Sequence, residues 1–272
     1  MNVSLDQLVQ LAKDAGAKTL SFFGTDLTVR YKSDQSPLTQ ADLASHALIQ
    51  AALEDWTPDI PVISEESALP DYAIRQTMDR FWIIDPLDGT KEFVKAIPEY
   101  TVNIALIEKA KPVMGVVGIP ATGTVYGAQK GRGSFRWESD GSKNELAPLK
   151  AKKQTPHQFV TSRSHLGANE LMLIEQLQAP EPIRAGSAVK FCLVAEGKAD
   201  AYIRHLPIME WDTAAGDLIL REVGGCAKDW NGVDLGYNKP DVRHAGLMAT
   251  ANKAMADNLM ALLDRLAIKA PF

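Results

Sequence analysis

The chain has 272 residues, of which 46% are hydrophobic, and its formal net charge is −5. This composition is typical of a globular protein with a sizeable core, and the charge argues against nucleic-acid binding by phosphate neutralisation. The N-terminal segment MNVSLDQLVQLAKDAG lacks a basic stretch followed by an apolar core, and no apolar run approaches the roughly 20 residues that span a bilayer. We therefore expect a cytoplasmic protein with no transmembrane segment and no nucleic-acid partner.

Two helices are predicted first along the chain. Apolar residues recur at helical spacing from Leu5 to Ala15, and Gly24 is expected to end this helix. The run TQAD at 39–42 is a capping box, which predicts a second helix that continues to Trp56.

Strands are predicted in the stretch that follows. Apolar runs at 60–63 and 81–84 predict two buried strands, each of which stops at acidic residues. Three further runs separated by short turns predict an antiparallel meander: 101–109, 111–120 and 124–131. The stretch 136–156 is polar and poorly patterned, so we interpret it as a seam between two parts of the chain.

Beyond the seam, predicted strands and helices alternate. The strands are expected at 157–163, 183–187, 199–205 and 245–252, and the helices at 168–177, 188–197, 213–225 and 253–268. This order predicts an α/β protein built as a sandwich of stacked helix and sheet layers. We divide it into an N-terminal α+β half, 1–147, and a C-terminal α/β half, 148–272.

Two acidic residues, Asp85 and Asp88, follow the second buried strand. Pro86 cannot donate to a strand ladder and is expected to end the strand, while Asp88-Gly89 is a turn signal, so the two carboxylates should converge. Alone they would repel each other, and a divalent cation that prefers oxygen ligands, Mg²⁺ or Mn²⁺, would remove the repulsion. The simpler alternative is an ordinary turn in which Asp85 caps a helix.

Other residues fit the same site. Glu65 ends the preceding strand and Asp212 precedes a helix, although singly each has a simpler explanation as a surface acid or an N-cap. The backbone N–H groups of Gly89 and Thr90 would face an incoming anion at a helix expected to begin at Lys91. The charge of two Mg²⁺ ions would balance that of four carboxylates, whereas three ions would leave an excess of positive charge. We therefore expect two or three ions. A phosphate ester that bridges the ions would complete a two-metal hydrolytic site.

The segments DPLDGTKEF, WDTAAGDLILREVGG and ISEES resemble those of the Mg²⁺-dependent, lithium-sensitive phosphatase superfamily that includes inositol monophosphatase. Within that superfamily, SPLTQAD, SRSH and GSAVKFCLVAEGKADAY are similar to the bacterial 3′(2′),5′-bisphosphate nucleotidases. The resemblance implies the αβαβα fold shared with fructose-1,6-bisphosphatase. It also implies hydrolysis of the 3′-phosphate of adenosine 3′,5′-bisphosphate, inhibition by Li⁺, and a role in clearing a by-product of sulfate assimilation.

The resemblance also implies which residues bind metal. Carried over residue by residue, the ligands are Glu65, Asp85 and the Leu87 carbonyl for one ion, and Asp85, Asp88 and Asp212 for the other. Thr90 is implied to orient the attacking water. Under this assignment the 1–147 half binds the metals and the 148–272 half completes the substrate site.

Candidate substrate contacts lie in the second half. Ser187 is expected to open a helix with Lys190 in its first turn, where amides and an ammonium could hold a second phosphate or the ribose. The simpler alternative is a plain N-cap beside a solvated lysine. The resemblance implies that His165 and Arg204 contact the adenosine bisphosphate. The full predicted set of substrate contacts is Gly89, Thr90, His165, Ser187, Lys190, Arg204 and Asp212.

The chain departs from its relatives at some positions. Leu206 and Ile208 stand where relatives have a glycine and a hydroxyl residue, which leaves an inositol monophosphatase or a histidinol-phosphatase as an alternative. Ser36 stands where several members place an aspartate near the catalytic water, although Thr39 could still contribute there. A non-catalytic nucleotide or cation sensor is the alternative from another class, and the intact acid set with Thr90 argues against it. We expect a monomer or a homodimer that binds a small phosphorylated substrate.

Overall fold

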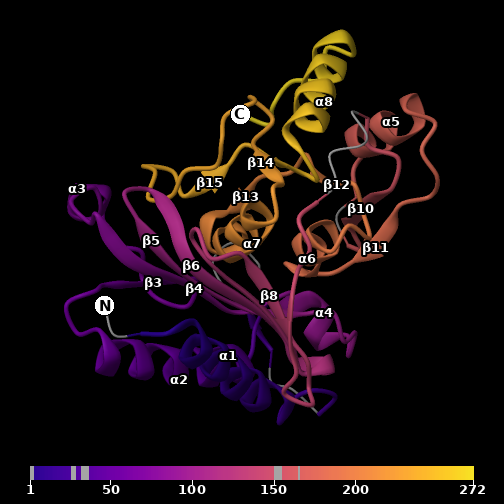
Figure 1. The fold of residues 1–272 in the computed structure, drawn as a ribbon. Coiled ribbons are helices and arrows are strands. Elements are labelled where there is room, and N and C mark those ends of the chain that lie inside the picture. Colours follow the sequence, from indigo (N-terminus) through magenta and orange to yellow (C-terminus); the bar gives the residue numbers. More distant parts are fainter. Residues whose placement is uncertain (1–2, 26–28, 32–36, 150–154, 165) are drawn as a thin grey trace.

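The structure is a computed structural model that describes the whole chain except residues 1–2, 26–28, 32–36, 150–154 and 165 (Figure 1). The predictions at Ser36 and His165 therefore lie outside the described residues. Among the described residues, none of the helices combines the length and the apolar character needed to cross a bilayer.

The helices confirm the predicted capping box at 39–42 and show a second one. They are α1 (Leu5–Leu20), α2 (Gln40–Trp56), α3 (Tyr72–Arg75), α4 (Thr90–Val94), α5 (Ala168–Gln176), α6 (Val189–Ala195), α7 (Glu210–Glu222) and α8 (Lys253–Arg265), with a 3-10 turn η1 at Pro120–Thr122. Thr39 caps α2 through the predicted box, and Ser4 caps α1 in the same way with Gln7. α1 ends at Leu20, before Gly24, because the chain turns over the intervening residues and reaches a positive φ of 73° at Gly24.

The first sheet contains the predicted meander. In spatial order its strands are β3 (Val62–Ser64), β4 (Arg80–Asp88), β5 (Thr101–Glu108), β6 (Lys111–Ile119), β7 (Thr124–Gln129), β8 (Ser134–Trp137) and β9 (Lys143–Glu145). β3 is parallel to β4, and the other neighbours are antiparallel. The polar stretch predicted as a seam supplies β9, whose side chains are all exposed. An edge strand needs only backbone pairing, so apolar patterning did not reveal it.

Alternation along β4 builds two separate cores. Phe81 and Ile83 point to one face of the first sheet and Trp82 and Ile84 to the other, because successive strand side chains alternate. On the Trp82 face the sheet packs against α1 and α2, and on the Phe81 face against α6 and α7. Figure 1 shows α1 and α2 below this sheet and α7 above it.

The second sheet supplies the next layer. Its strands in spatial order are β11 (Ile183–Ala185), β10 (Phe159–Ser162), β12 (Ala201–Arg204), β16 (Leu247–Thr250) and β14 (Cys226–Lys228). β10 is parallel to β11 and β12, whereas β16 is antiparallel to β12 and β14. Two small two-stranded sheets complete the described strands: β1 (Arg30–Tyr31) with β2 (Pro37–Leu38), and β13 (Ile208–Met209) with β15 (Arg243–His244).

The layers give the predicted fold. One face of the second sheet shares the core of α6 and α7, and the other face packs against α5 and α8 through a third core. The order of layers is thus helix, sheet, helix, sheet, helix, which confirms the αβαβα sandwich (Figure 1). The described sheets lie on either side of the expected boundary at 147/148, and the division into two halves stays a prediction.

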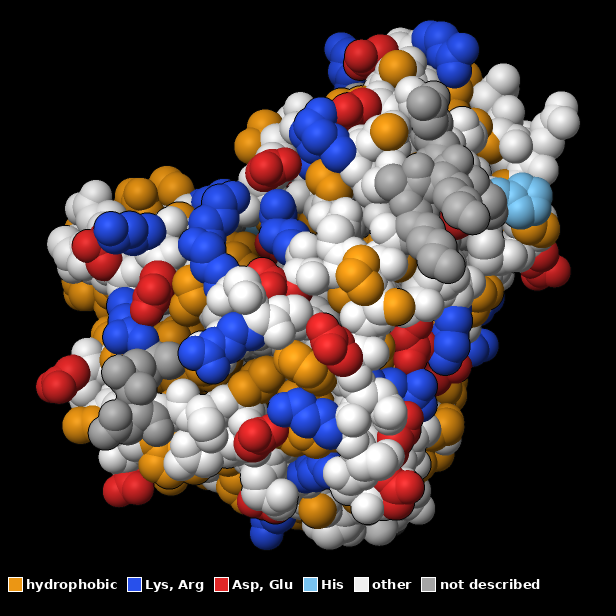
Figure 2. All heavy atoms as spheres, viewed as in Figure 1, with side chains coloured by type: hydrophobic (Ala, Val, Ile, Leu, Met, Phe, Trp, Pro, Cys, Tyr) orange, Lys and Arg blue, Asp and Glu red, His pale blue; other side chains and the backbone are white. Residues whose placement is uncertain are grey.

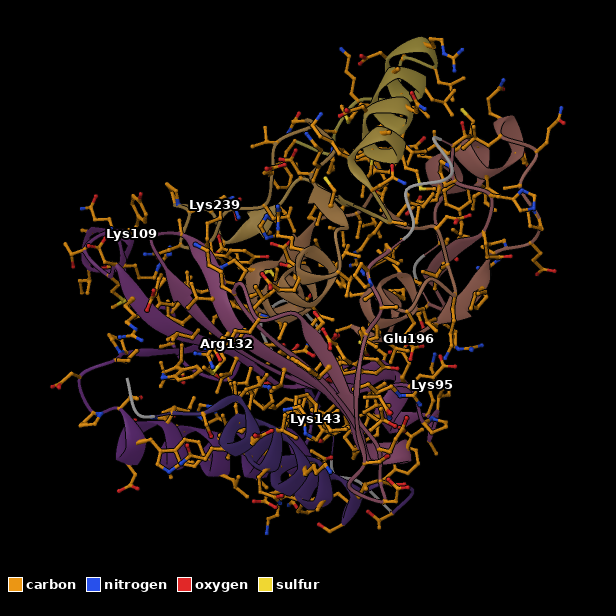
Figure 3. The ribbon with its side chains drawn as sticks, viewed as in Figure 1. Lys95, Lys109, Arg132, Lys143, Glu196 and Lys239 are labelled. Atoms are coloured by element: carbon orange, nitrogen blue, oxygen red, sulfur yellow. The ribbon has the colours of Figure 1, made fainter. Side chains whose placement is uncertain are left out.

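Polar contacts also join the end of α6 to the first sheet. Glu196, labelled in Figure 3, follows α6 and accepts hydrogen bonds from the Tyr126 hydroxyl and the Arg136 guanidinium of the first sheet, each at 2.9 Å. On the face shown in Figure 2, acidic and basic side chains are interspersed. That mixed surface agrees with the small formal net charge of −5.

Candidate active site

A cavity of about 410 Å³ opens where the two sheets and α7 meet. It is lined by side chains from both halves of the chain. All described residues of the predicted site line it: Glu65, Asp85, Leu87, Asp88, Gly89, Thr90, Ser187, Lys190, Arg204 and Asp212. Segments that are far apart in the sequence therefore meet at one place.

Three acids approach one another most closely in this cavity. Glu65, Asp85 and Asp212 each offer a carboxylate oxygen, and these oxygens all lie within 4.8 Å of one another. Asp88 lines the same cavity but is not part of this closest group. Asp85 is only 1% exposed, so its charge has little solvent to screen it.

Burial and mutual repulsion oppose ionisation of these acids. Burial raises the pKa of Asp85 well above its usual range, and the neighbouring charges add to the shift in the order Glu65, Asp88 and Asp212. The pKa of Asp212 is raised well above its usual range first by burial and then by Asp88 and Glu65. Burial also raises the pKa of Asp88, and the Lys190 ammonium opposes this shift. A divalent cation among these oxygens would relieve the repulsion.

A bulge in β4 brings Asp85 and Asp88 to the cavity. Asp85 pairs with Asn103 and Asp88 with Thr101. Between these two pairs β4 has one residue more than β5. The prediction that Pro86 ends the strand is wrong, because a bulge accommodates a residue without an N–H and the ladder resumes at Asp88.

The bulge is fixed by local hydrogen bonds. Asp85 Oδ1 accepts a hydrogen bond of 3.0 Å from the Leu87 backbone N–H. The hydroxyl of Ser45, on α2, donates to the Pro86 carbonyl at 2.8 Å. The same residues therefore form a local turn and contribute to the acid group. The simpler interpretation of this segment as an ordinary turn does not exclude an acid site.

Gly89 lets the chain turn sharply into α4. Its φ is 97°, and a Cβ at this position would collide with the hydroxyl oxygen of Ser187. Both observations require glycine. α4 begins at Thr90, one residue before the predicted start at Lys91, and runs only to Val94.

Asp42 contacts the site through Thr90, although from the sequence it was predicted only as part of a capping box. Thr90 Oγ1 lies 3.2 Å from Asp42 Oδ1 and 3.3 Å from the Leu87 carbonyl oxygen. The other carboxylate oxygen of Asp42 accepts from the backbone N–H of Thr39 at 2.8 Å and from its hydroxyl at 2.5 Å. Burial raises the pKa of Asp42, and the hydrogen bonds from Thr39 act against that shift. The capping box was the only sequence pattern at this position, and such a local pattern does not predict the contact with Thr90.

Ser187 does not open α6, contrary to the prediction. Ala188 is the N-cap residue, and Ser187 has a positive φ of 49°. The Ser187 hydroxyl lies 2.7 Å from the Asp88 carbonyl oxygen and 3.1 Å from that of Glu99. The side chain thus binds the turn after β4 instead of capping its own helix.

Lys190 is not a solvated side chain. It is 3% exposed, and its ammonium donates to the Ser187 carbonyl at 2.5 Å and the Ala185 carbonyl at 3.4 Å. The ammonium also lies 5.0 Å from the centre of the Tyr202 ring. Burial lowers the pKa of Lys190 to about 8, and the charge of Asp88 opposes that shift. The simple alternative of a surface lysine is therefore wrong.

The second half also supplies Arg204 and Asp212. The Arg204 guanidinium donates to the carbonyls of Leu206 and Pro207 at 3.4 and 3.3 Å. Ile208 lines the cavity, whereas Leu206 is 44% exposed. Asp212 lies in the first turn of α7 rather than before the helix, because α7 begins at Glu210, earlier than predicted.

Comparisons with known proteins agree with this geometry. The model of the Inositol monophosphatase family matches residues 2–267. The protein named 3′(2′),5′-bisphosphate nucleotidase CysQ from Escherichia coli (strain K12) is 42% identical over 236 residues, or 86% of this chain and 93% of that protein. The protein of the same name from Shigella flexneri is 42% identical over 235 residues, with the same two coverages of 86% and 93%.

Solved structures give the same result. The crystal structure of CysQ from Bacteroides thetaiotaomicron, a bacterial member of the inositol monophosphatase family, matches with a TM-score of 0.77 at 38% identity, covering 90% of this chain and 96% of that one. An IMPase of Thermotoga maritima matches with a TM-score of 0.79 at 23% identity, covering 97% of both chains, which shows the fold alone. These matches confirm the predicted family and the prediction of a phosphatase. Since the family model spans nearly the whole chain, we conclude that the protein belongs to the inositol monophosphatase family.

Proposed function

We propose that the protein is a Mg²⁺-dependent 3′(2′),5′-bisphosphate nucleotidase that releases the 3′-phosphate of adenosine 3′,5′-bisphosphate to give AMP. The sulfated form of that nucleotide is a second proposed substrate, and clearing a by-product of sulfate assimilation is the proposed role. The observation that carries the proposal is the group of three carboxylates within 4.8 Å inside one cavity. The substrate is supported by relatives at 42% identity that are named as nucleotidases of this kind.

The donor set fits a divalent cation. The acids are oxygen donors, and burial together with repulsion raises the pKa values of Asp85 and Asp212, a cost that a cation would offset. The proposed ligands are Glu65, Asp85, the Leu87 carbonyl, Asp88 and Asp212, for two or three Mg²⁺ ions or for Mn²⁺ as a substitute. When bound, such ions lower the pKa of an attacking water and stabilise the leaving oxygen.

Asp42 and Thr90 supply an acid–base path within the chain itself. The Thr90 hydroxyl lies 3.2 Å from Asp42 Oδ1, and a hydroxyl that donates to a carboxylate can still accept a hydrogen bond from water. Burial raises the pKa of Asp42, which makes it a stronger base than an exposed carboxylate. We infer that the Thr90 hydroxyl orients the attacking water. As the water gives a proton to Thr90 Oγ1, the Thr90 hydroxyl proton passes to Asp42 Oδ1.

The second half supplies positive charge for the anionic substrate. Lys190 and Arg204 line the same cavity as the acids. The two carbonyls that Lys190 contacts leave the third N–H of its ammonium for a substrate oxygen. The proposed substrate contacts are Gly89, Thr90, His165, Ser187, Lys190, Arg204 and Asp212. A cytoplasmic location and a monomeric or homodimeric active species are part of the same proposal.

Phosphate release by the purified protein tests the proposal. The substrates are adenosine 3′,5′-bisphosphate, its sulfated form, inositol 1-phosphate, histidinol phosphate and fructose 1,6-bisphosphate, each with Mg²⁺ and with a chelator. We expect the adenosine bisphosphate to have the highest kcat/KM and the chelator to abolish release. Faster release from inositol 1-phosphate would assign the other activity of the family, and binding of the nucleotide without release from any substrate would indicate a sensor.

Asp88→Asn tests the acid assignment. We expect this variant to lose phosphate release by a factor of about 10² or more, because it removes a charged metal ligand. It should unfold at nearly the wild-type temperature, because it removes the charge of a half-buried side chain rather than core packing. Asp257→Asn is the matched control, since Asp257 is an exposed acid on α8 that pairs only with Lys253 among the described residues. Equal activity of Asp88→Asn and the control would show that Asp88 is not a metal ligand required for phosphate release.

A further inference from the structure

Two side chains of strand β5 contact the carboxylate of Asp88. Thr101 Oγ1 and Asn103 Nδ2 each lie 3.3 Å from Asp88 Oδ2. Both residues are buried, at 0% and 2% exposure. They are two positions apart on one strand, so their side chains share a face of the sheet. The bulge in β4 sets Asp88 directly opposite Thr101.

These contacts distinguish the two carboxylate oxygens of Asp88. Oδ2 accepts from two donors, whereas Oδ1 accepts no hydrogen bond from the part of the chain that the structure describes. The Thr101 hydroxyl in turn accepts from the Ala188 backbone N–H at 3.4 Å, so its own proton is directed to Asp88. A carboxylate held in this way cannot rotate freely, and Oδ1 is the oxygen left for a cation.

Asn103 places one polar atom in the interior without a hydrogen-bond partner among the described residues. That atom is the amide oxygen Oδ1. An unpaired buried acceptor destabilises a fold, and an apolar side chain of the same shape would avoid that cost. The contact that the side chain does make is the one from Nδ2 to Asp88.

We propose that Thr101 and Asn103 are positioning residues that orient Asp88 to bind a divalent cation. The inference rests on the proposed function, because it takes Asp88 as a metal ligand. Groups that hydrogen-bond a metal ligand fix its orientation, and their loss typically costs 10–100-fold in metal affinity. Residues with a purely structural role would lower the unfolding temperature and leave cation affinity unchanged.

The test is calorimetric titration of Mg²⁺, and separately of Mn²⁺, into the full chain without substrate. Thr101→Val removes the hydroxyl at nearly constant shape, and Asn103→Leu removes the amide. We expect each to bind Mg²⁺ about tenfold or more weakly than wild type. Thr101→Ser restores the donor and should restore the affinity.

Thr250→Val is the matched control. Thr250 is also a fully buried strand threonine, and it lies in the second sheet. Its hydroxyl lies 2.9 Å from the Asn252 carbonyl, and among the described residues it has no contact with the acids. We expect this variant to lose stability like Thr101→Val but to keep wild-type affinity for Mg²⁺. Circular dichroism establishes that each variant is folded, and Asn103→Leu carries the test if Thr101→Val does not fold.

Two outcomes overturn the inference. Wild-type Mg²⁺ affinity in folded Thr101→Val or Asn103→Leu would show that the donors do not orient Asp88. Equal weakening in Thr250→Val would show a general effect of lost stability. Neither outcome affects the proposed function if wild type still hydrolyses adenosine 3′,5′-bisphosphate. Conversely, the expected pattern of affinities in a protein that releases no phosphate would support the positioning role and refute the nucleotidase.

Discussion

Each carboxylate oxygen of Asp42 has a separate role. Oδ2 accepts from Thr39 and caps α2, while Oδ1 lies 3.2 Å from the Thr90 hydroxyl in the cavity. The side chain is fully buried, so the position of its charge is fixed by these contacts rather than by solvent. One residue therefore couples the start of a helix to the acid site.

Asp42→Asn separates the two roles. We expect kcat to fall by a factor of about 10²–10⁴, because the variant loses the proton acceptor behind Thr90, with little change in KM. The loss of the charged cap should also cost stability of about 1 kcal/mol. Steady-state phosphate release and denaturant unfolding measure the two effects.

The control for this variant is Ser4→Ala. Ser4 caps α1 in the same kind of capping box, and it is not among the residues that line the cavity. This variant should lose about 1 kcal/mol of stability and keep the wild-type kcat. An unchanged kcat in Asp42→Asn would show that the carboxylate only caps the helix.

At the scale of elements, the start of α7 is held by a chain of polar contacts in which Thr213 and His244 are buried. His244 of β15 lies between Lys239 and Thr213: its Nδ1 is 3.1 Å from the Lys239 ammonium and its Nε2 is 3.2 Å from the Thr213 hydroxyl. An ammonium can only donate, so Nδ1 must be unprotonated and Nε2 carries the proton. The Thr213 hydroxyl then donates to the Glu210 carbonyl at 3.1 Å, in the first turn of the helix that carries Asp212.

This chain predicts a loss of stability in acid. Burial, reinforced by the Lys239 ammonium, lowers the pKa of His244 from 6.5 to about 3. The unfolded state therefore binds one more proton than the folded state between these values, and stability that is fully present above pH 6.5 is lost as pH falls toward 3. The loss is at most about 1.4 kcal/mol for each pH unit.

Urea unfolding between pH 4 and 7 measures this loss, with His244→Gln as the comparison. The variant cannot titrate, so the free energy of unfolding should depend less steeply on pH than in wild type over that range. The expected difference has one sign only, with the wild type losing more stability in acid. Parallel curves for the two proteins would mean that His244 is not held neutral in the folded state.

The sequence was informative where the chemistry coincides with the end of an element. Glu65 and Asp85 were located because acidic residues interrupt apolar runs, and the cavity does bring them together. It was less informative where a side chain has a role across the fold. The burial of Lys190 and the contact of Ser187 with the turn after β4 depend on how α6 packs, and local patterns carry no information on that packing.

At the scale of the whole molecule, the site exists only where the two halves meet. Glu65 and Asp85 come from the first sheet, while Asp212 comes from α7 in the second half of the chain. α7 also packs against the face of the first sheet that carries Phe81 and Ile83. Folding of that sheet and assembly of the acid group therefore depend on the same contact.

The proposed boundary at 147/148 can be tested by cutting the chain there. A fragment 1–147 keeps the core between the first sheet and helices α1 and α2, but it loses α6 and α7 from the other face. Exposed strands with an uncovered apolar face are not expected to form a stable domain. We therefore expect this fragment alone to bind a hydrophobic dye and to unfold without a cooperative transition.

Mixing the fragment with 148–272 provides the decisive comparison. If the shared core is what completes the first sheet, the two fragments together should recover a cooperative thermal transition and Mg²⁺-dependent phosphate release. Mg²⁺ should raise the midpoint of that transition, because a cation held by acids from both fragments binds only the assembled state. A fragment 1–147 that unfolds cooperatively by itself would instead show that the halves are independent domains, and the acids would then be brought together by docking of preformed units rather than by folding.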